Sequence, residues 1–167
     1  LADYAFFMAL KQHFGMKSWT EWPDEVRMRD RAALEKYRAL LADDIDFYIY
    51  IQFLFAKQWD AMHAYAKENG IGIIGDLPIY AALDSADVWA QPQFFSLDAQ
   101  GFPTAVAGVP PDYFCEDGQL WGNPLYDWDA MRADGFGWWI RRIAAAAKRC
   151  DAIRIDHFRA FASYWAV

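Results

Sequence analysis

The first 70 residues carry hydrophobic positions at helical spacing. Residues 1–14 are crowded with large apolar side chains and stop at a glycine, which predicts a core helix. From residue 43 to 69 no Gly or Pro interrupts apolar positions that recur at three and four, which predicts a long amphipathic helix. Between them, charges of alternating sign over 24–41 indicate a solvated helix surface. Residues 1–70 are therefore expected to be mainly helical, with rings such as Phe53 packed between helices.

The pattern changes to strands after residue 70. Residues 71–76 form a short apolar run that predicts a buried parallel strand, and residues 151–159 open with the strict alternation of a second strand. Helical sequence begins at Asp129 or Asp134 and runs to Arg149. The order over 71–167 is thus strand, long loop, helix and strand, which is typical of the βαβ unit of a parallel sheet.

The helix before the second strand has a two-sided pattern. Its apolar stripe includes Trp138, Trp139 and Ile143. Its cations are expected on the outer side, facing solvent: Arg141, Arg142, Lys148 and Arg149.

The long loop differs in kind from its surroundings. From residue 91 to 128 neither period is sustained, and five prolines and four glycines stand beside eight aromatic residues. Loops of this length in compact domains are usually functional or disordered, and the aromatic density argues against disorder. We interpret it as an ordered substrate loop; a loop that serves only the scaffold is the alternative. Ahead of it, Ser85 is expected to cap a short helix.

Composition narrows the class of partner. The chain has 167 residues and is 56% hydrophobic, and its formal net charge of −7 argues against a nucleic-acid partner or an anionic membrane surface. The two cysteines, 115 and 150, do not suggest a disulfide framework, so a reducing compartment such as the cytoplasm is expected. Because the chain opens at Leu1 without Met and closes at Val167 within an apolar run, we expect an internal segment of a longer protein.

Both predicted strands end in an aspartate, Asp76 and Asp156. In a (β/α) barrel the carboxyl ends of the strands open onto the face that carries the active site. Alternation places Arg154 and Asp156 on the same side, where the guanidinium would hold the carboxylate ionised, as a carboxylate nucleophile requires. A buried ion pair without catalytic role is the alternative for these two, and a tie to the following loop is the alternative for Asp76. His157 would either bind a sugar hydroxyl or cap the strand end.

Aromatic residues make up 19% of the chain, which suits a carbohydrate ligand. Sugar faces stack on rings, while their hydroxyls bond to carboxylates and to amides such as Gln119 and Asn123. Retaining glycosyl transfer also needs a carboxylic acid, and none of the five glutamates ends a predicted strand, so the acid is missing or lies outside this segment. The sequence shows no Gly-rich phosphate loop and no metal-ligand spacing, so no cofactor and no metal are expected.

Five motifs in order resemble the 4-α-glucanotransferases, also called amylomaltases or disproportionating enzymes. They are residues 74–80 (IGDLPIY), 84–89 (DSADVW), 106–114 (VAGVPPDYF), 118–126 (GQLWGNPLY) and 154–159 (RIDHFR). The resemblance implies an α/β fold, a partial α-amylase-like (β/α)8 TIM barrel in which residues 1–167 form one central segment of the catalytic domain. Asp76 would end the third barrel strand and Asp156 the fourth.

The resemblance also implies residue roles. Asp156 matches the nucleophile that forms a covalent glucosyl-enzyme, and Arg154 matches the arginine that orients it. Substrate-binding positions are implied for Asp76, Tyr80, Asp112, Phe114, Gln119, Trp121, Asn123 and His157. Residues 110–118 match a flexible loop over the cleft, which would exclude water.

The activity implied is transfer of α-1,4-glucan segments from a maltooligosaccharide donor to the 4-hydroxyl of an acceptor glucan, with retention. The family's acid/base glutamate follows a later strand, beyond Val167, so the segment alone is expected to be inactive. A non-catalytic glucan-binding remnant and an α-glucan hydrolase of the same clan are the alternatives.

Overall fold

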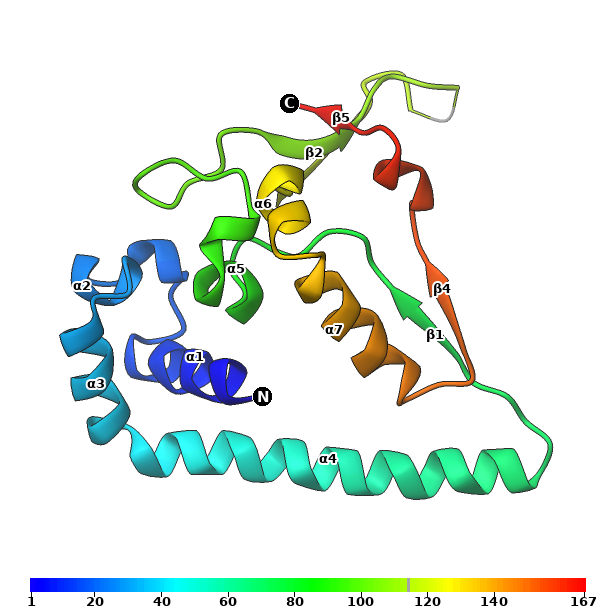
Figure 1. Ribbon diagram of the computed structural model, residues 1–167, viewed down its shortest axis with the longest axis horizontal. Coiled ribbons are helices and arrows are strands. Elements are labelled where there is room, and N and C mark those ends of the chain that lie inside the picture. Colours follow the sequence, from blue (N-terminus) through cyan, green and yellow to red (C-terminus); the bar gives the residue numbers. More distant parts are fainter. Residues whose placement is uncertain (114) are drawn as a thin grey trace.

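The computed structural model describes residues 1–113 and 115–167, and the chain folds as helices followed by an α/β part (Figure 1). The first part comprises α1 (Ala2–His13), the 3-10 helix η1 (Trp19–Glu21), α2 (Asp24–Arg27), α3 (Arg31–Leu40) and α4 (Ala42–Glu68). The second comprises β1 (Ile74–Leu77), α5 (Ala86–Ala90), η2 (Pro92–Phe94), β2 (Val106–Val109), β3 (Gln119–Pro124), α6 (Trp128–Ala133), α7 (Gly137–Ala147), β4 (Ala152–Ile155), η3 (Phe158–Phe161) and β5 (Trp165–Ala166).

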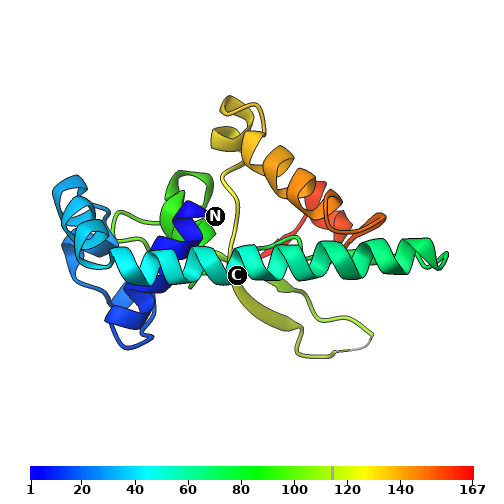
Figure 2. The same ribbon diagram turned by 90° about the horizontal axis from the view of Figure 1, so that it is seen from below.

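The long helix α4 confirms the prediction made from its spacing. It has 27 residues and runs along most of the length of the molecule, from α3 to the turn before β1 (Figures 1 and 2). It ends at Asn69 and Gly70, where Gly70 takes the positive φ of +73° that favours glycine. The expected packing of Phe53 is wrong, because that side chain is 57% exposed and only Ala66 of the helix is buried. Helix α1 packs against α4, as Figure 1 shows, and the Trp59 indole N–H of α4 donates to the Arg149 carbonyl over 2.7 Å.

The charged stretch after residue 24 is largely solvated, as expected, since α3 has no buried residue, but two of its arginines also contact core rings. It forms two helices, α2 and α3, broken near Arg29, which has a φ of +62°. The Arg29 guanidinium lies 4.5 Å from the ring centroid of the buried Trp89, and burial lowers the pKa of Arg29. Arg38 lies 4.0 Å from the ring centroid of Phe6. Both cations therefore cover core rings, which sign alternation along the chain cannot reveal.

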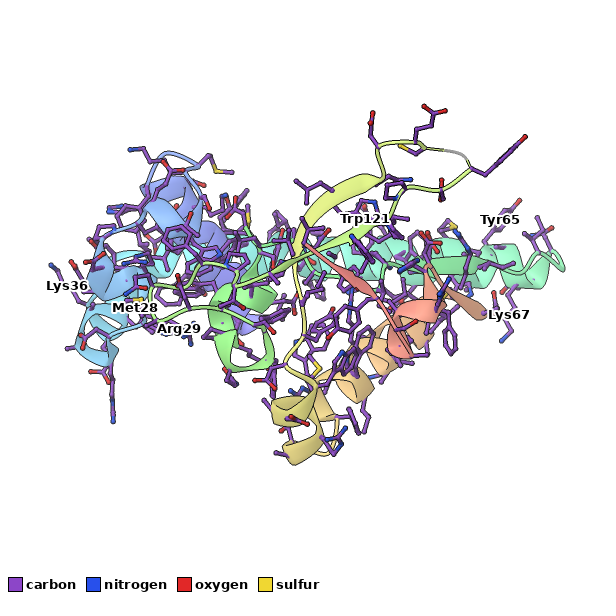
Figure 3. The ribbon with its side chains drawn as sticks, turned by 90° about the horizontal axis from the view of Figure 1, so that it is seen from above. Met28, Arg29, Lys36, Tyr65, Lys67 and Trp121 are labelled. Carbon is purple, nitrogen blue, oxygen red and sulfur yellow. The ribbon has the colours of Figure 1, made fainter. Side chains whose placement is uncertain are left out.

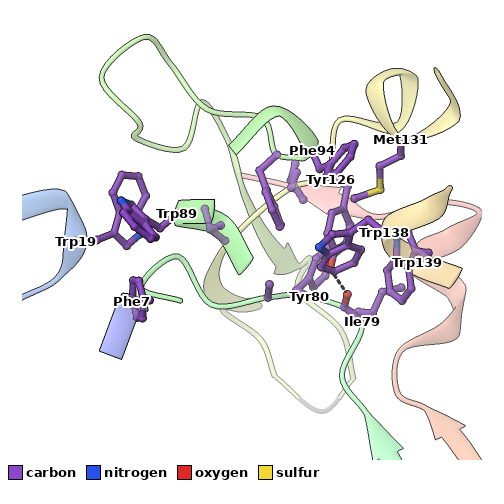
Figure 4. Packing of buried hydrophobic residues seen from close by; sticks show 14 of the residues in the cluster. Phe7, Trp19, Ile79, Tyr80, Trp89, Phe94, Tyr126, Met131, Trp138 and Trp139 are labelled. Carbon is purple, nitrogen blue, oxygen red and sulfur yellow. Dashed lines mark hydrogen bonds between the residues drawn. The ribbon is translucent and has the colours of Figure 1, made fainter. Parts of the chain in front are cut away.

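Aromatic side chains build the core in two neighbouring groups (Figure 4). In the first, Trp89 packs edge-on against Phe6 at 5.8 Å between ring centroids, and its indole N–H donates to the Val26 carbonyl over 3.2 Å. In the second, Tyr126 contacts Trp138 and Trp139, each at 5.5 Å. Contacts of this kind each contribute about 0.5–1.5 kcal/mol beyond burial. The expected Ser85 cap of α5 is present, with Oγ accepting from the Val88 amide over 3.3 Å.

The predicted βαβ unit is present. Strands β1 and β4 are parallel neighbours, with Asp76 opposite Arg154, and α7 lies beside both strands (Figure 1). Three details differ from the prediction. Strand β1 is not buried, since Ile74 is 72% exposed. The single expected helix is two helices, because Gly135 and Phe136 both take positive φ between α6 and α7. The first of them begins at an Asp127 cap rather than at Asp129.

Residues 91–128 are not the loop without strands that their pattern suggested. Strands β2 and β3 pair antiparallel, with a register shift between Val106 and Gly108, and β5 adds to the free edge of β2. Figure 2 shows this ribbon and α7 on opposite sides of α4. The turn depends on Gly118 at φ +71°, where an added Cβ would lie 2.5 Å from the Val109 carbonyl oxygen. The strands have four and six residues and contain glycines, so they were too short and irregular for a period of two to stand out.

A side-chain hydrogen bond fastens α4 to the start of β4. His63 Nε2 lies 2.9 Å from Asp151 Oδ2, which also accepts from the Ile73 amide over 2.9 Å. The hydrogen bond from the Ile73 amide lowers the pKa of Asp151 most, and the hydrogen bond with His63 lowers it further. A lowered pKa in the folded state adds stability above the unfolded value of about 3.9, and that stability is lost as the pH falls through the lower folded value.

We therefore expect Asp151→Asn to lower the melting temperature of the intact protein at pH 6. The difference from the unsubstituted protein should shrink as the pH falls from about 4 through the lower folded-state pKa, below which the carboxylate is protonated in both states. Thermal melts followed by circular dichroism from pH 3 to 7 measure this. A difference that is the same at pH 3 and pH 6 would contradict the assigned cause.

Candidate functional site

The candidate site lies where β1 and β4 end. Arg154 Nη2 donates to Asp156 Oδ1 over 2.5 Å, and Nη1 donates to Asp76 Oδ1 over 3.3 Å. One guanidinium thus bridges carboxylates from the two parallel strands, in the register that pairs Asp76 with Arg154. The side chains of Arg154 and Asp156 are 62% and 56% exposed in this chain, and the alternative of a buried ion pair within a complete barrel stays a hypothesis. In the described residues the Asp76 carboxylate is held by Arg154 and not by amides of the following loop.

A hollow of about 200 Å³ opens beside Asp156. Five of the residues predicted for the site line it, together with Pro78 and Ile79: Tyr80, Trp121, Asn123, Asp156 and His157. They come from three separate segments, namely the turn after β1, the strand β3 and the turn after β4. The fold therefore gathers the nucleophile candidate and most of the predicted ligand contacts around one cavity.

Strand β3 brings an indole ring to this cavity. The Trp121 ring lies edge-on to the His157 ring at 5.0 Å between centroids, and its Nε1 donates to Gln119 Oε1 over 3.0 Å. Figure 3 shows Trp121 partway along the molecule, well away from Arg29 and Lys36 at one end. Gln119 is exposed and does not line the hollow, so it acts on the site by holding Trp121.

The turn after β1 supplies a phenol to the cavity wall. The Tyr80 ring stacks on Tyr126 at 6.0 Å and meets the edge of Trp121 at 6.2 Å. Its buried hydroxyl has no hydrogen-bond partner in the described part of the chain. Burial, and then the neighbouring Tyr164, raise the pKa of Tyr80, so the group stays a neutral hydroxyl at ordinary pH. Nearby, the Asn123 amide donates to the Ala81 carbonyl over 3.0 Å and fixes β3 to this turn.

His157 joins the small hollow to a second one. Its backbone is left-handed, with φ 53° and ψ 41°, a conformation that costs a non-glycine residue about 1–3 kcal/mol and is common at functional sites. It does not cap the following 3-10 helix η3 by its side chain. The second hollow, about 380 Å³, is lined by Gly108, Val109, Pro110, Asp112, His157, Arg159, Ser163, Tyr164 and Trp165. The predicted Asp112 thus lies in the neighbouring cavity, where its carboxylate also accepts from the Cys115 amide over 2.8 Å.

Three predicted residues, Arg154 among them, line neither hollow, and one lies outside the described residues. Asp76 and Gln119 line neither cavity and reach the site through Arg154 and Trp121. Phe114 is the predicted contact that falls outside the described residues. The sequence reasoning missed Tyr164 and Trp165, because their place follows from the pairing of β5 with β2 across the chain. No local pattern carries that signal.

The geometry is suited to a polyhydroxylated ligand with apolar faces. An exposed carboxylate, oriented by a cation, stands beside an indole ring, an imidazole, an amide and a neutral phenol. Rings and uncharged polar groups recognise the two kinds of surface of a sugar. Among the described residues, no group of three or more His, Cys, Asp or Glu is placed to hold a metal ion. Within the same residues, no helix is both long enough and apolar enough to cross a membrane.

Comparisons with known proteins agree with this chemistry. The profile of a family described as 4-alpha-glucanotransferase matches residues 1–167. The chain is 52% identical to the 4-alpha-glucanotransferase of Thermus thermophilus, over 100% of this chain and 33% of that protein. It is also 52% identical to the chloroplastic/amyloplastic 4-alpha-glucanotransferase of Solanum tuberosum, over 100% of this chain and 29% of that protein.

A solved structure extends the likeness to the fold. The amylomaltase from Streptococcus agalactiae in complex with acarbose superposes with a TM-score of 0.94 at 48% identity, over 99% of this chain and 34% of that one. The chain therefore has the α/β arrangement of the matching part of an amylomaltase. It spans about a third of the length of the relatives it matches.

Proposed function

The chain belongs to the 4-alpha-glucanotransferase family, and we propose that the protein that carries it transfers α-1,4-glucan segments between maltooligosaccharides. The observation that carries the proposal is the exposed Asp156 carboxylate, held by the Arg154 guanidinium over 2.5 Å beside a ring-lined hollow. The acarbose in the similar amylomaltase supports an oligosaccharide as the ligand class.

In the proposed architecture, residues 1–167 are the central segment of a catalytic (β/α)8 barrel. β1 is its third strand and β4 its fourth. Two features support this: the strands are parallel neighbours in the register Asp76 to Arg154, and α7, which precedes β4, lies beside both strands. The carboxyl ends of barrel strands carry the chemistry in such folds, and the candidate site lies at those ends.

In the proposed reaction, a carboxylate oxygen of Asp156 attacks the anomeric carbon of the donor. The bond from that carbon to the leaving glucan oxygen breaks, and the oxygen takes a proton from a glutamic acid supplied by the rest of the protein. The 4-hydroxyl of an acceptor glucan then displaces Asp156 and returns its proton to the same glutamate, so the configuration is retained. No cofactor takes part in this sequence.

The other site residues are proposed to bind glucan. Tyr80, Trp121, Asn123 and His157 surround the hollow at Asp156, and Asp112 extends the binding surface toward the second cavity. Asp76, Gln119 and Phe114 are proposed contacts on the family's pattern. The ribbon turn over 110–118 would close over the cleft and exclude the water that competes with the acceptor. The free thiols of Cys115 and Cys150 support a reducing compartment, for which we propose the cytoplasm.

Incubation of the intact protein with maltotriose tests the activity. We expect glucose together with maltodextrins longer than the substrate, at a constant number of reducing ends, because transfer exchanges glycosidic bonds without net hydrolysis. Chromatography of the products and a reducing-end assay on the same samples measure both quantities. A steady gain in reducing ends without longer products would identify a hydrolase instead. Binding of maltotriose without any product would identify a glucan-binding protein.

A further inference from the structure

Arg142 on α7 is partly buried and bound to neighbouring groups, and does not extend freely into solvent as its place in the helical pattern suggested. Its Nη2 donates to the Pro78 carbonyl over 2.7 Å, and its Nη1 donates to the Ile79 carbonyl over 3.1 Å. Nη1 also lies 3.1 Å from the Tyr126 hydroxyl. The guanidinium carbon is 5.1 Å from the ring centroids of both Trp138 and Trp139. Hydrogen bonds and ring faces thus fix this side chain from several directions.

The two carbonyls belong to the wall of the candidate cavity. Pro78 and Ile79 directly follow β1, and with Tyr80 they form one side of the hollow that Asp156 and His157 line. The Tyr126 hydroxyl donates to the same Ile79 carbonyl over 2.6 Å, a bond drawn in Figure 4. This turn lies beyond the paired residues of β1 and β4. Side chains therefore hold it in position, whereas pairing with β4 holds Asp76.

We propose that Arg142 is a positioning residue for the transfer reaction, one that sets the cavity wall of Pro78, Ile79 and Tyr80 relative to Asp156. The inference rests on the proposed function. A guanidinium suits this task because its planar fork can serve two carbonyls at once, whereas an ammonium acts as a single point of charge. A misplacement of about 1 Å by a group far from the chemistry can cost roughly a hundredfold in rate.

The test uses the intact protein with Arg142→Gln, Arg142→Lys and the matched control Arg141→Gln. Arg141 is the next residue on the same helix and is exposed. We expect Arg142→Gln to lower kcat/KM for maltotriose by about 10- to 100-fold at a temperature well below its melting point. Arg142→Lys should recover part of this loss, because the positive charge and one donor remain.

A double variant separates positioning from simple loss of stability. If Arg142 acts through the wall that carries Tyr80, the losses of Arg142→Gln and Tyr80→Phe should not multiply, because both variants then weaken the proposed contact between the Tyr80 hydroxyl and the bound glucan. A role in stability alone predicts a lower melting temperature with kcat and KM of the folded enzyme within twofold of the control, and that result would overturn the inference. Should Arg142→Gln fail to fold, Arg142→Lys decides by the same criterion against Arg141→Lys.

Acarbose binding measured by calorimetry keeps this inference distinct from the proposed function. An unsubstituted protein that binds acarbose without transferring glucose refutes the proposed activity only. Arg142→Gln must then weaken acarbose binding severalfold, and an unchanged affinity overturns the positioning role. A protein that neither transfers nor binds acarbose overturns both.

Discussion

Replacing Asp156 with Asn in the intact protein is expected to lower the rate of glucose transfer from maltotriose by about 10⁴-fold, or about 5.4 kcal/mol of barrier. The amide oxygen cannot form the glycosyl ester through which the proposed reaction proceeds. The substitution is nearly isosteric, so the fold should be retained. Initial rates together with a melting curve measure the effect.

The matched control is Asp151→Asn, the same change at the other end of the same strand. Asp151 binds His63 and the Ile73 amide and does not line either cavity. It should alter stability and leave kcat within a factor of a few. A fluorinated glucosyl donor that slows the second step would also leave a covalent adduct on the peptide that contains Asp156. Full activity in Asp156→Asn, or an adduct on another peptide, would contradict its role as nucleophile.

The parallel strand pair could be predicted from sequence because its signals are local. Alternation over 151–156 fixes which side chains share a face, and the structure has Arg154 and Asp156 more exposed than Ile153 and Ile155 on the other face. The order of strand, helix and strand then made the two strands parallel. What remained open was the burial of the ion pair, which depends on the elements that surround the strands.

The parts that sequence reasoning missed depend on contacts between distant positions. Arg142 was expected in solvent because its position in the helical pattern lies outside the apolar stripe. Its carbonyl partners, however, lie 63 and 64 residues earlier in the chain. Arg29 likewise covers Trp89, 60 positions away. The ribbon of β2 and β3 was missed because its strands pair with each other and carry no period of their own. Arg142 and Arg29 are the cations most worth testing, since burial of a charge demands specific partners.

Arg154→Met is expected to lower kcat by about 10³-fold, or about 4 kcal/mol of barrier. In the structure one guanidinium serves Asp156 over 2.5 Å and Asp76 over 3.3 Å. Methionine fills a similar volume without charge, so two carboxylates at the ends of adjacent strands would lose the cation they share. Arg154→Lys should be less impaired, with a loss of about 10- to 100-fold, because an ammonium keeps the charge without the fork.

Because Arg154 also contacts Asp76, a double variant can test how Arg154 acts on Asp156. If the guanidinium positions Asp156 partly by screening it from Asp76, removing the second carboxylate should relieve part of the damage. If the two single substitutions acted independently, their fold-losses in kcat would multiply. The double variant Asp76→Asn with Arg154→Met is instead expected to have a higher kcat than that multiplied loss gives. Single-turnover rates with a slow fluorinated donor isolate the step in which Asp156 attacks. Losses that simply multiply would show that Arg154 acts on Asp156 alone, and an Arg154→Met variant with unchanged kcat would remove it from the mechanism.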